Sequence, residues 1–224
     1  MADTKPVRIT RLIAIPTVIT LAVTILRVVG ELKHWPSPWF NTAPGGGGAL
    51  VGISWLPIIF GPYFALKLAG AGEGAASMGK AIGFALGSLV VLAAGGALFG
   101  STINHANFLT AIGLLLMLGA AFVPGLGWRA LGSTLVAYAF AARIPVLIVM
   151  YFAIMGNGGA GWGTHYDGVP PSLASLPPLR KFFFAGVLPQ LTLWIGFTAV
   201  VGSIFGTVVT AVVRRKKQAV PAAV

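Results

Sequence analysis

The residue type in this sequence with the widest chemical use is histidine, and the chain contains three: His34, His105 and His165. An imidazole ring exchanges protons near neutral pH and can bind a metal ion, a haem or an anion. Each histidine lies in a different polar segment, and none has the H-x-x-H or H-E-x-x-H spacing of a zinc site on one helix. We therefore keep all three as candidate ligand or metal residues, predict no defined metal site and leave the cofactor unassigned.

Two arginines, Arg27 and Arg143, lie inside long apolar runs. A charged residue at the centre of a membrane helix costs about 2.5–3.5 kcal/mol on insertion scales, so it usually faces a partner or a hydrated cavity. Glu31 follows Arg27 by four residues and would lie one turn away on the same helix face. Together with Asn104 and Asp167, we expect these residues to form one polar pocket in the outer leaflet. The alternative is a structural ion-pair cluster whose arginines reach toward lipid headgroups.

Residues 74–80, Gly-Ala-Ala-Ser-Met-Gly-Lys, match the first seven positions of a phosphate-binding loop. The next position should be a Ser or Thr that holds Mg²⁺, but it is Ala81. The motif should also follow a β-strand, whereas this segment joins two apolar runs. We interpret it as a turn with Lys80 at the membrane interface.

The elements that must position these side chains are the apolar runs themselves. Mean hydropathy is +0.91, and 8% of the residues are charged, against about 25% in soluble domains. A hydrocarbon core of about 30 Å needs about 20 apolar residues per helix. The sequence therefore predicts an all-α integral membrane protein, a bundle of six transmembrane helices at residues 12–30, 49–69, 79–101, 107–124, 129–155 and 186–213.

The basic residues predict how this bundle is oriented. Of the 15 Lys and Arg residues, ten flank one set of helix ends, two lie within spans, and three (Lys33, Arg180 and Lys181) flank the other set. Because cytoplasmic loops carry the excess of positive charge, both termini are predicted to be cytoplasmic. The chain is then one membrane domain, 1–224, with short basic tails at 1–11 and 214–224 and a long outer loop at 156–181.

The net charge of +11 does not indicate a nucleic-acid-binding protein, because the basic residues flank the apolar runs. The closing cluster of Arg214, Arg215, Lys216 and Lys217 is expected to contact anionic lipid headgroups. The absence of cysteine excludes disulfides and thiolate metal sites. A composition rich in Gly and Ala, without an N-x-Ser/Thr sequon, favours a bacterial cytoplasmic membrane.

Small residues predict which helix faces pack together, since they let helix backbones approach closely in lipid. Gly79, Gly83 and Gly87 repeat every four residues in the third run, and Gly202 and Gly206 in the sixth. We expect both stripes to pack within one chain rather than between two chains.

Three functions are compatible with these patterns. The leading hypothesis is a non-catalytic accessory or structural subunit, or a small binding protein, whose polar outer site faces a ligand or another membrane subunit. The second is a transporter or channel for an anion or other small molecule, with Arg27 and Arg143 as binding groups. The third is a membrane enzyme or metal-binding protein that uses the histidines of the outer loops.

Overall fold

The computed structural model describes residues 7–46, 48–102 and 108–219, and within these ranges it contains helices and no β-strand. Five helical stretches are long and apolar enough to cross a membrane. The all-helical class predicted from the sequence is confirmed for this part of the chain. The five stretches are α1 (Ile9–Leu32), α3 (Met78–Thr102), α4 with α5 (Phe108–Ala120 and Pro124–Gly127), α6 (Arg129–Gly159) and the run of α7, η3, α8 and α9 (Pro178–Lys181, Phe182–Val187, Leu188–Leu191 and Leu193–Ala219).

Helix α2 (Leu56–Gly70) is apolar but shorter than these five stretches, with 15 residues, or about 22 Å at 1.5 Å per residue. The sequence predicted a helix from residue 49, and this was wrong: residues 49–55 form turns and bends. Pro57 lies in the first turn of α2, where its missing N–H leaves no hydrogen bond unmade. Before it, the indole Nε1 of Trp55 donates to the carbonyl oxygen of Leu50 at 3.2 Å and stabilises the turn.

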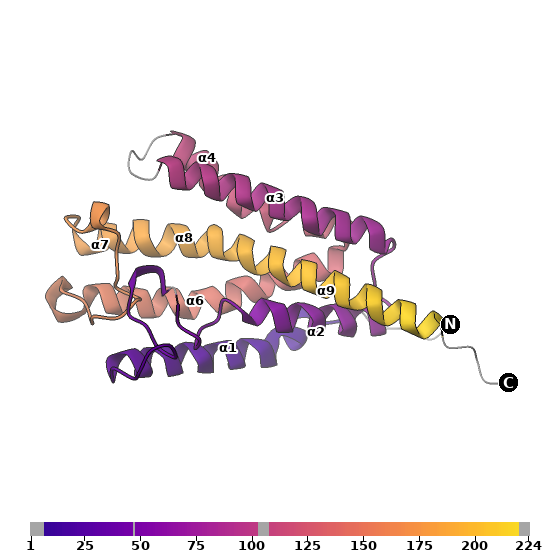
Figure 1. Ribbon diagram of the computed structural model, residues 1–224, viewed down its shortest axis with the longest axis horizontal. Coiled ribbons are helices and arrows are strands. Elements are labelled where there is room, and N and C mark those ends of the chain that lie inside the picture. The colour runs from indigo at the N-terminus through magenta and orange to yellow at the C-terminus, as the bar shows by residue number, and fades with distance from the viewer. Residues whose placement is uncertain (1–6, 47, 103–107, 220–224) are drawn as a thin grey trace.

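Figure 1 shows an elongated bundle in which α1 begins and α9 ends at the same end. We call this the terminal end, and we call the opposite end, which holds residues 33–43 and 160–177, the loop end. Helix α9 lies in the middle, in contact with α2, α3, α4 and α6, while α1 packs along α6. At the terminal end Glu73 joins three elements, because its Oε1 accepts the N–H of Val7 at 2.5 Å and its carbonyl oxygen accepts Nε1 of Trp128 at 2.8 Å.

The polarity of α1 is inverted relative to a helix of a soluble protein. Its buried face carries Thr20, Thr24, Arg27 and Glu31. Its exposed face carries large apolar side chains such as Ile15, which is 67% exposed. Apolar side chains gain free energy by leaving water, so this arrangement suits a helix surrounded by lipid.

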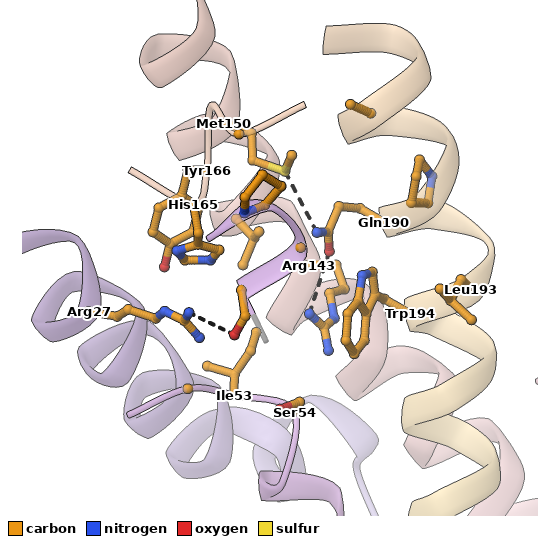
Figure 2. Close-up of a pocket in the computed structure, with 18 of the residues that line it drawn as sticks. Arg27, Ile53, Ser54, Arg143, Met150, His165, Tyr166, Gln190, Leu193 and Trp194 are labelled. Carbon is orange, nitrogen blue, oxygen red and sulfur yellow. Dashed lines mark hydrogen bonds between the residues drawn. The ribbon is translucent and has the colours of Figure 1, made fainter. Parts of the chain in front are cut away.

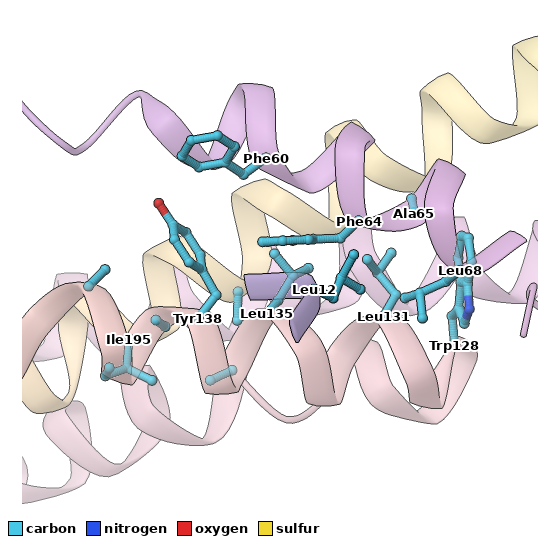
Figure 3. Close-up of a cluster of buried hydrophobic side chains, with 14 of the residues drawn as sticks. Leu12, Phe60, Phe64, Ala65, Leu68, Trp128, Leu131, Leu135, Tyr138 and Ile195 are labelled. Atoms are coloured by element: carbon cyan, nitrogen blue, oxygen red, sulfur yellow. The ribbon is translucent and has the colours of Figure 1, made fainter. Parts of the chain in front are cut away.

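The main hydrophobic core lies toward the terminal end, where α1, α2, α6 and α9 meet (Figure 3). The rings of Phe60 and Phe64 both contact the ring of Tyr138, with centroids 5.5 and 5.4 Å apart. The Tyr138 hydroxyl is within 2.7 Å of the Thr20 hydroxyl, so its polar end is satisfied inside the core. This aromatic cluster is part of the main hydrophobic core.

The two predicted glycine stripes behave differently. A Cβ at Gly61 would lie 2.1 Å from the carbonyl oxygen of Gly202, so α2 and α9 can approach this closely only without side chains there. The expectation for the Gly202 stripe is therefore confirmed. The expectation for Gly79, Gly83 and Gly87 was wrong: these residues are exposed, and a Cβ at each would have no neighbour within 4 Å.

The last predicted loop and the last predicted span also differ from the structure. Helical structure resumes at Pro178 rather than at residue 186. The backbone of α6 leaves the helical conformation at Gly156–Gly158, so the predicted loop start at residue 156 is confirmed, and only its predicted end at residue 181 was wrong. The helical residues before 186 include the π-helical turn η3. After the short helix α8, the backbone is distorted at Thr192 (φ −118°, ψ −76°). The predicted boundaries of α1 and α3 lie within three residues of those in the structure.

Candidate functional site

A cavity of about 500 Å³ lies in the half of the bundle nearer the loop end. This volume falls within the range of about 300–1,000 Å³ that is usual for small-molecule sites. Its walls come from α1, α3, α6, the irregular residues 44–54, loop residues 165–173 and the η3–α9 stretch. Figure 2 labels ten of the lining residues. Two of the residues predicted to form a polar pocket, Arg27 and Arg143, both line this cavity, from opposite sides in Figure 2.

Arg27 is fixed by an acid and by backbone oxygen atoms. Its Nε donates to Oε1 of Glu31 at 2.8 Å, so the ion pair expected from the four-residue spacing is present. Its Nη2 donates to the carbonyl oxygen of Gly46 at 3.0 Å. Gly46 has φ +69°, and a Cβ there would lie 3.0 Å from the same Nη2. The glycine-rich segment therefore supplies both a left-handed backbone conformation and the space that the guanidinium fills.

Glu31 connects this pair to the loop that follows α6. Its side chain is fully buried, and its Oε2 accepts the backbone N–H of His165 at 2.8 Å. Its Oε1 also lies 2.6 Å from Nδ1 of His165. An ionised carboxylate can only accept hydrogen bonds, so Nδ1 carries the proton in this contact. One carboxylate thus receives three donors and links α1 to residues 160–177.

The pKa of His165 is lowered, first because burial disfavours the charged imidazolium, although the hydrogen bond to Glu31 opposes that effect. Burial also raises the pKa of the neighbouring Tyr166 phenol. Burial therefore favours the neutral form of both loop side chains, which line the cavity.

Arg143 has no such partner. It is 4% exposed, and among the described residues its Nε has no hydrogen-bond partner. Its Nη1 makes one long contact of 3.5 Å with Oε1 of Gln190, and the Trp194 ring centroid lies 4.6 Å from its guanidinium carbon. Within the described ranges no carboxylate forms a salt bridge with it. A cation–π contact is worth about 2 kcal/mol when desolvated, which does not replace a counter-ion.

The backbone is irregular on two sides of the cavity. Residues 44–55 contain a short 3₁₀ turn, η1 (Pro44–Gly46), followed by turns and bends. On the other side, Phe184 and Ala185 come from the π-helical turn η3. At membrane depth, non-helical backbone is tolerated where it is buried in protein or lines a cavity, and π-turns are frequent at functional sites.

The remaining predicted site residues lie elsewhere or outside the description. Asp167 does not line the cavity: its carboxylate accepts the backbone N–H groups of Gly163 and Thr164 at 3.0 and 2.8 Å and shapes its own loop. His34 is exposed and absent from the cavity wall. Asn104 and His105 lie outside the described residues. In the described part of the chain, no three His, Asp or Glu side chains are grouped to hold a metal ion.

Sequence reasoning missed three cavity residues: Tyr166, Gln190 and Trp194. The sequence could have indicated Gln190, because an amide side chain within an apolar span needs a polar partner. Trp194 follows it by four residues and therefore lies on the same face of the helical stretch. Tyr166 offered no signal, since its position depends on how residues 160–177 fold back over the bundle.

No family model, curated protein or solved structure matches this chain.

Proposed function

We propose that this protein is a six-span protein of the bacterial cytoplasmic membrane that binds a small anionic molecule from the outer side. The binding site is the cavity between Arg27 and Arg143, and the protein acts by binding rather than by catalysis. Such a binding protein can work alone or as a subunit beside other membrane proteins.

The observation that carries the proposal is the buried, uncompensated charge of Arg143. Arg27 is neutralised by Glu31, whereas among the described residues the Arg143 guanidinium contacts a neutral amide and an indole ring and forms no salt bridge. A buried cation without a counter-ion is costly, and an anionic ligand in the adjacent cavity would remove that cost. The unsatisfied Nε and the weakly satisfied Nη1 are donors suited to a carboxylate or phosphate oxygen.

Access from one side also supports binding. The lining includes Pro170 and Gly45 at the loop end, both of which are exposed. Toward the terminal end, the rings of Phe60, Phe64 and Tyr138 pack against one another in the buried core. A channel would need a continuous path past these rings, whereas a binding site needs only the opening at the loop end.

Six spans are supported by the path of the chain between α1 and α3. The N-terminal end of α1 and the turn after α2 lie together, because Val7 bonds to Glu73. The chain must therefore return across the bundle between Lys33 and Glu73, and it does so through residues 44–55 and α2. The terminal end is then cytoplasmic by the positive-inside rule, and the basic cluster from Arg214 to Lys217 meets anionic headgroups there.

Reporter fusions test this threading. A reporter fused after Gly72 and a reporter fused after Lys217 are both expected to give a cytoplasmic signal, and one fused after Gly161 an external signal. The Gly72 fusion decides the matter, because a chain in which α2 failed to cross would place both Gly72 and Lys217 outside. An external signal at Gly72 would overturn the six-span proposal.

Calorimetric titration of the purified protein tests the binding site. Sulfate, phosphate and acetate are added to the protein in nanodiscs, with acetamide as the uncharged analogue of acetate. At least one anion is expected to bind, and Arg143→Gln is expected to weaken it by about tenfold or more, because a hydrogen bond to a charged group is worth about 1.5–3 kcal/mol. The control is Arg180→Gln, which removes an exposed arginine outside the cavity. Equal affinity for the wild type and Arg143→Gln would overturn the proposal.

A further inference from the structure

The cavity is far more apolar than a site for an inorganic anion needs to be. Beyond its two arginines, its wall includes the side chains of Ile53, Val146, Met150 and Leu193. Sites for inorganic anions are built from donors such as backbone N–H groups and basic side chains. Here the charged hydrogen-bond donors of the cavity wall are the side chains of Arg143 and Arg27, and most of the remaining wall is apolar.

The cavity also extends to the lipid-facing surface of the bundle. Phe99 of α3 and Phe184 of η3 both line it, and Phe184 is 42% exposed. The neighbouring helix surfaces carry many exposed apolar side chains, such as Phe183 and Leu89, which suit contact with acyl chains. One part of the cavity therefore opens near the loop end, and another part reaches residues that face the hydrocarbon.

On this basis we infer that the ligand is an amphiphilic anion: a carboxylate or phosphate head attached to a hydrocarbon chain. The inference rests on the proposed anion site and names its ligand class. The head lies against Nε of Arg143, which is unpaired in the described structure, and against its weakly bonded Nη1, beside Gln190 and Trp194. The chain lies against Met150, Leu193 and Phe184, toward the bilayer.

The volume agrees with this ligand class. A cavity of about 500 Å³ is several times larger than sulfate or phosphate requires, and sites of this size usually enclose an organic molecule. An acyl chain of moderate length fills the apolar part without new polar partners. Only the charged head then needs a specific hydrogen-bond donor, and Arg143 provides it.

A chain-length series tests the inference. Acetate, butyrate, hexanoate and octanoate are titrated into the protein in nanodiscs, and heats from protein-free nanodiscs are subtracted to remove partitioning into lipid. Affinity is expected to rise by about fourfold for each added methylene until the cavity is filled, which is the fold-change for about 0.8 kcal/mol per buried CH₂. Octanol, which has no charge, is expected to bind much more weakly than octanoate.

A matched pair of variants locates the chain. Phe184→Ala removes a lining side chain, whereas Phe183→Ala removes its neighbour, which is similarly exposed (47%) but does not line the cavity. Phe184→Ala is expected to weaken octanoate by about tenfold and to leave acetate unchanged, while Phe183→Ala changes neither. If acetate or phosphate bound through Arg143 as tightly as octanoate, the amphiphile inference would fail and the anion site would stand. If no anion bound in an Arg143-dependent way, both would fail.

Discussion

Arg143→Met is expected to raise the thermal stability of the ligand-free protein and to abolish anion binding. Methionine fills a similar volume and removes a buried charge that has no counter-ion in the described structure. Replacing buried ionic groups with apolar residues of similar size is often neutral or stabilising by about 1–4 kcal/mol. For a chain of this length, each kcal/mol shifts the melting temperature by about 2–4 °C. Thermal unfolding of the purified variant in detergent measures the shift.

Arg27→Met is the matched comparison, because it makes the same substitution in the same cavity. Here the expected sign is opposite, since Arg27 partners Glu31, and its loss would leave that buried carboxylate with only the donors of His165. Breaking one member of a buried pair costs about 3–5 kcal/mol. A fall in melting temperature for both variants would mean that Arg143 is a structural residue, and the argument for an empty anion site would lose its basis. Opposite shifts would show that the cavity contains one structural arginine and one functional arginine.

The helical fold could be predicted from the sequence because lipid imposes strong local rules. Residues 81–104 contain no charge, and such a run specifies a membrane helix with little dependence on tertiary structure. The start of α2 could not be predicted from the apolar pattern in the same way. A Cβ at Gly52 would lie 2.9 Å from Nη1 of Arg27, and the apolar pattern of residues 49–55 does not indicate this tertiary contact. The exposed stripe of Gly79, Gly83 and Gly87 failed for a related reason: spacing shows that a close approach is possible, not which partner makes it.

The site could be predicted only where local spacing was enough. The Arg27–Glu31 pair follows from two residues one helical turn apart. The contact between Glu31 and His165 spans 134 positions, and no local pattern could have indicated it. Asp167 shows the opposite error. Its carboxylate was predicted to join the polar pocket, but it accepts hydrogen bonds from its own loop instead. A charged residue type indicates that a partner is needed, but only the tertiary structure identifies that partner.

Glu31→Gln is expected to cause a large loss of stability, of the same order as that of Arg27→Met. The carboxylate of Glu31 accepts from Nε of Arg27 and from the backbone N–H and Nδ1 of His165. A glutamine has one oxygen in place of two, and its NH₂ group would face donors. It would also leave Arg27 buried without a counter-ion. The expected cost is about 3–5 kcal/mol, or a fall in melting temperature of about 6–20 °C by the same scaling.

Lys33→Gln is the control for this substitution, because it also removes one charge, lies two residues away and is exposed. Its effect is expected to stay within about 0.5 kcal/mol, as for most surface changes. Limited proteolysis gives a second measurement, since Glu31 links α1 to the loop that carries His165. Cleavage within residues 160–177 is expected to accelerate in Glu31→Gln and not in Lys33→Gln. Equal melting temperatures for the two variants would contradict the proposed role of Glu31, because the carboxylate would then contribute no more than an exposed charge at the end of the same helix.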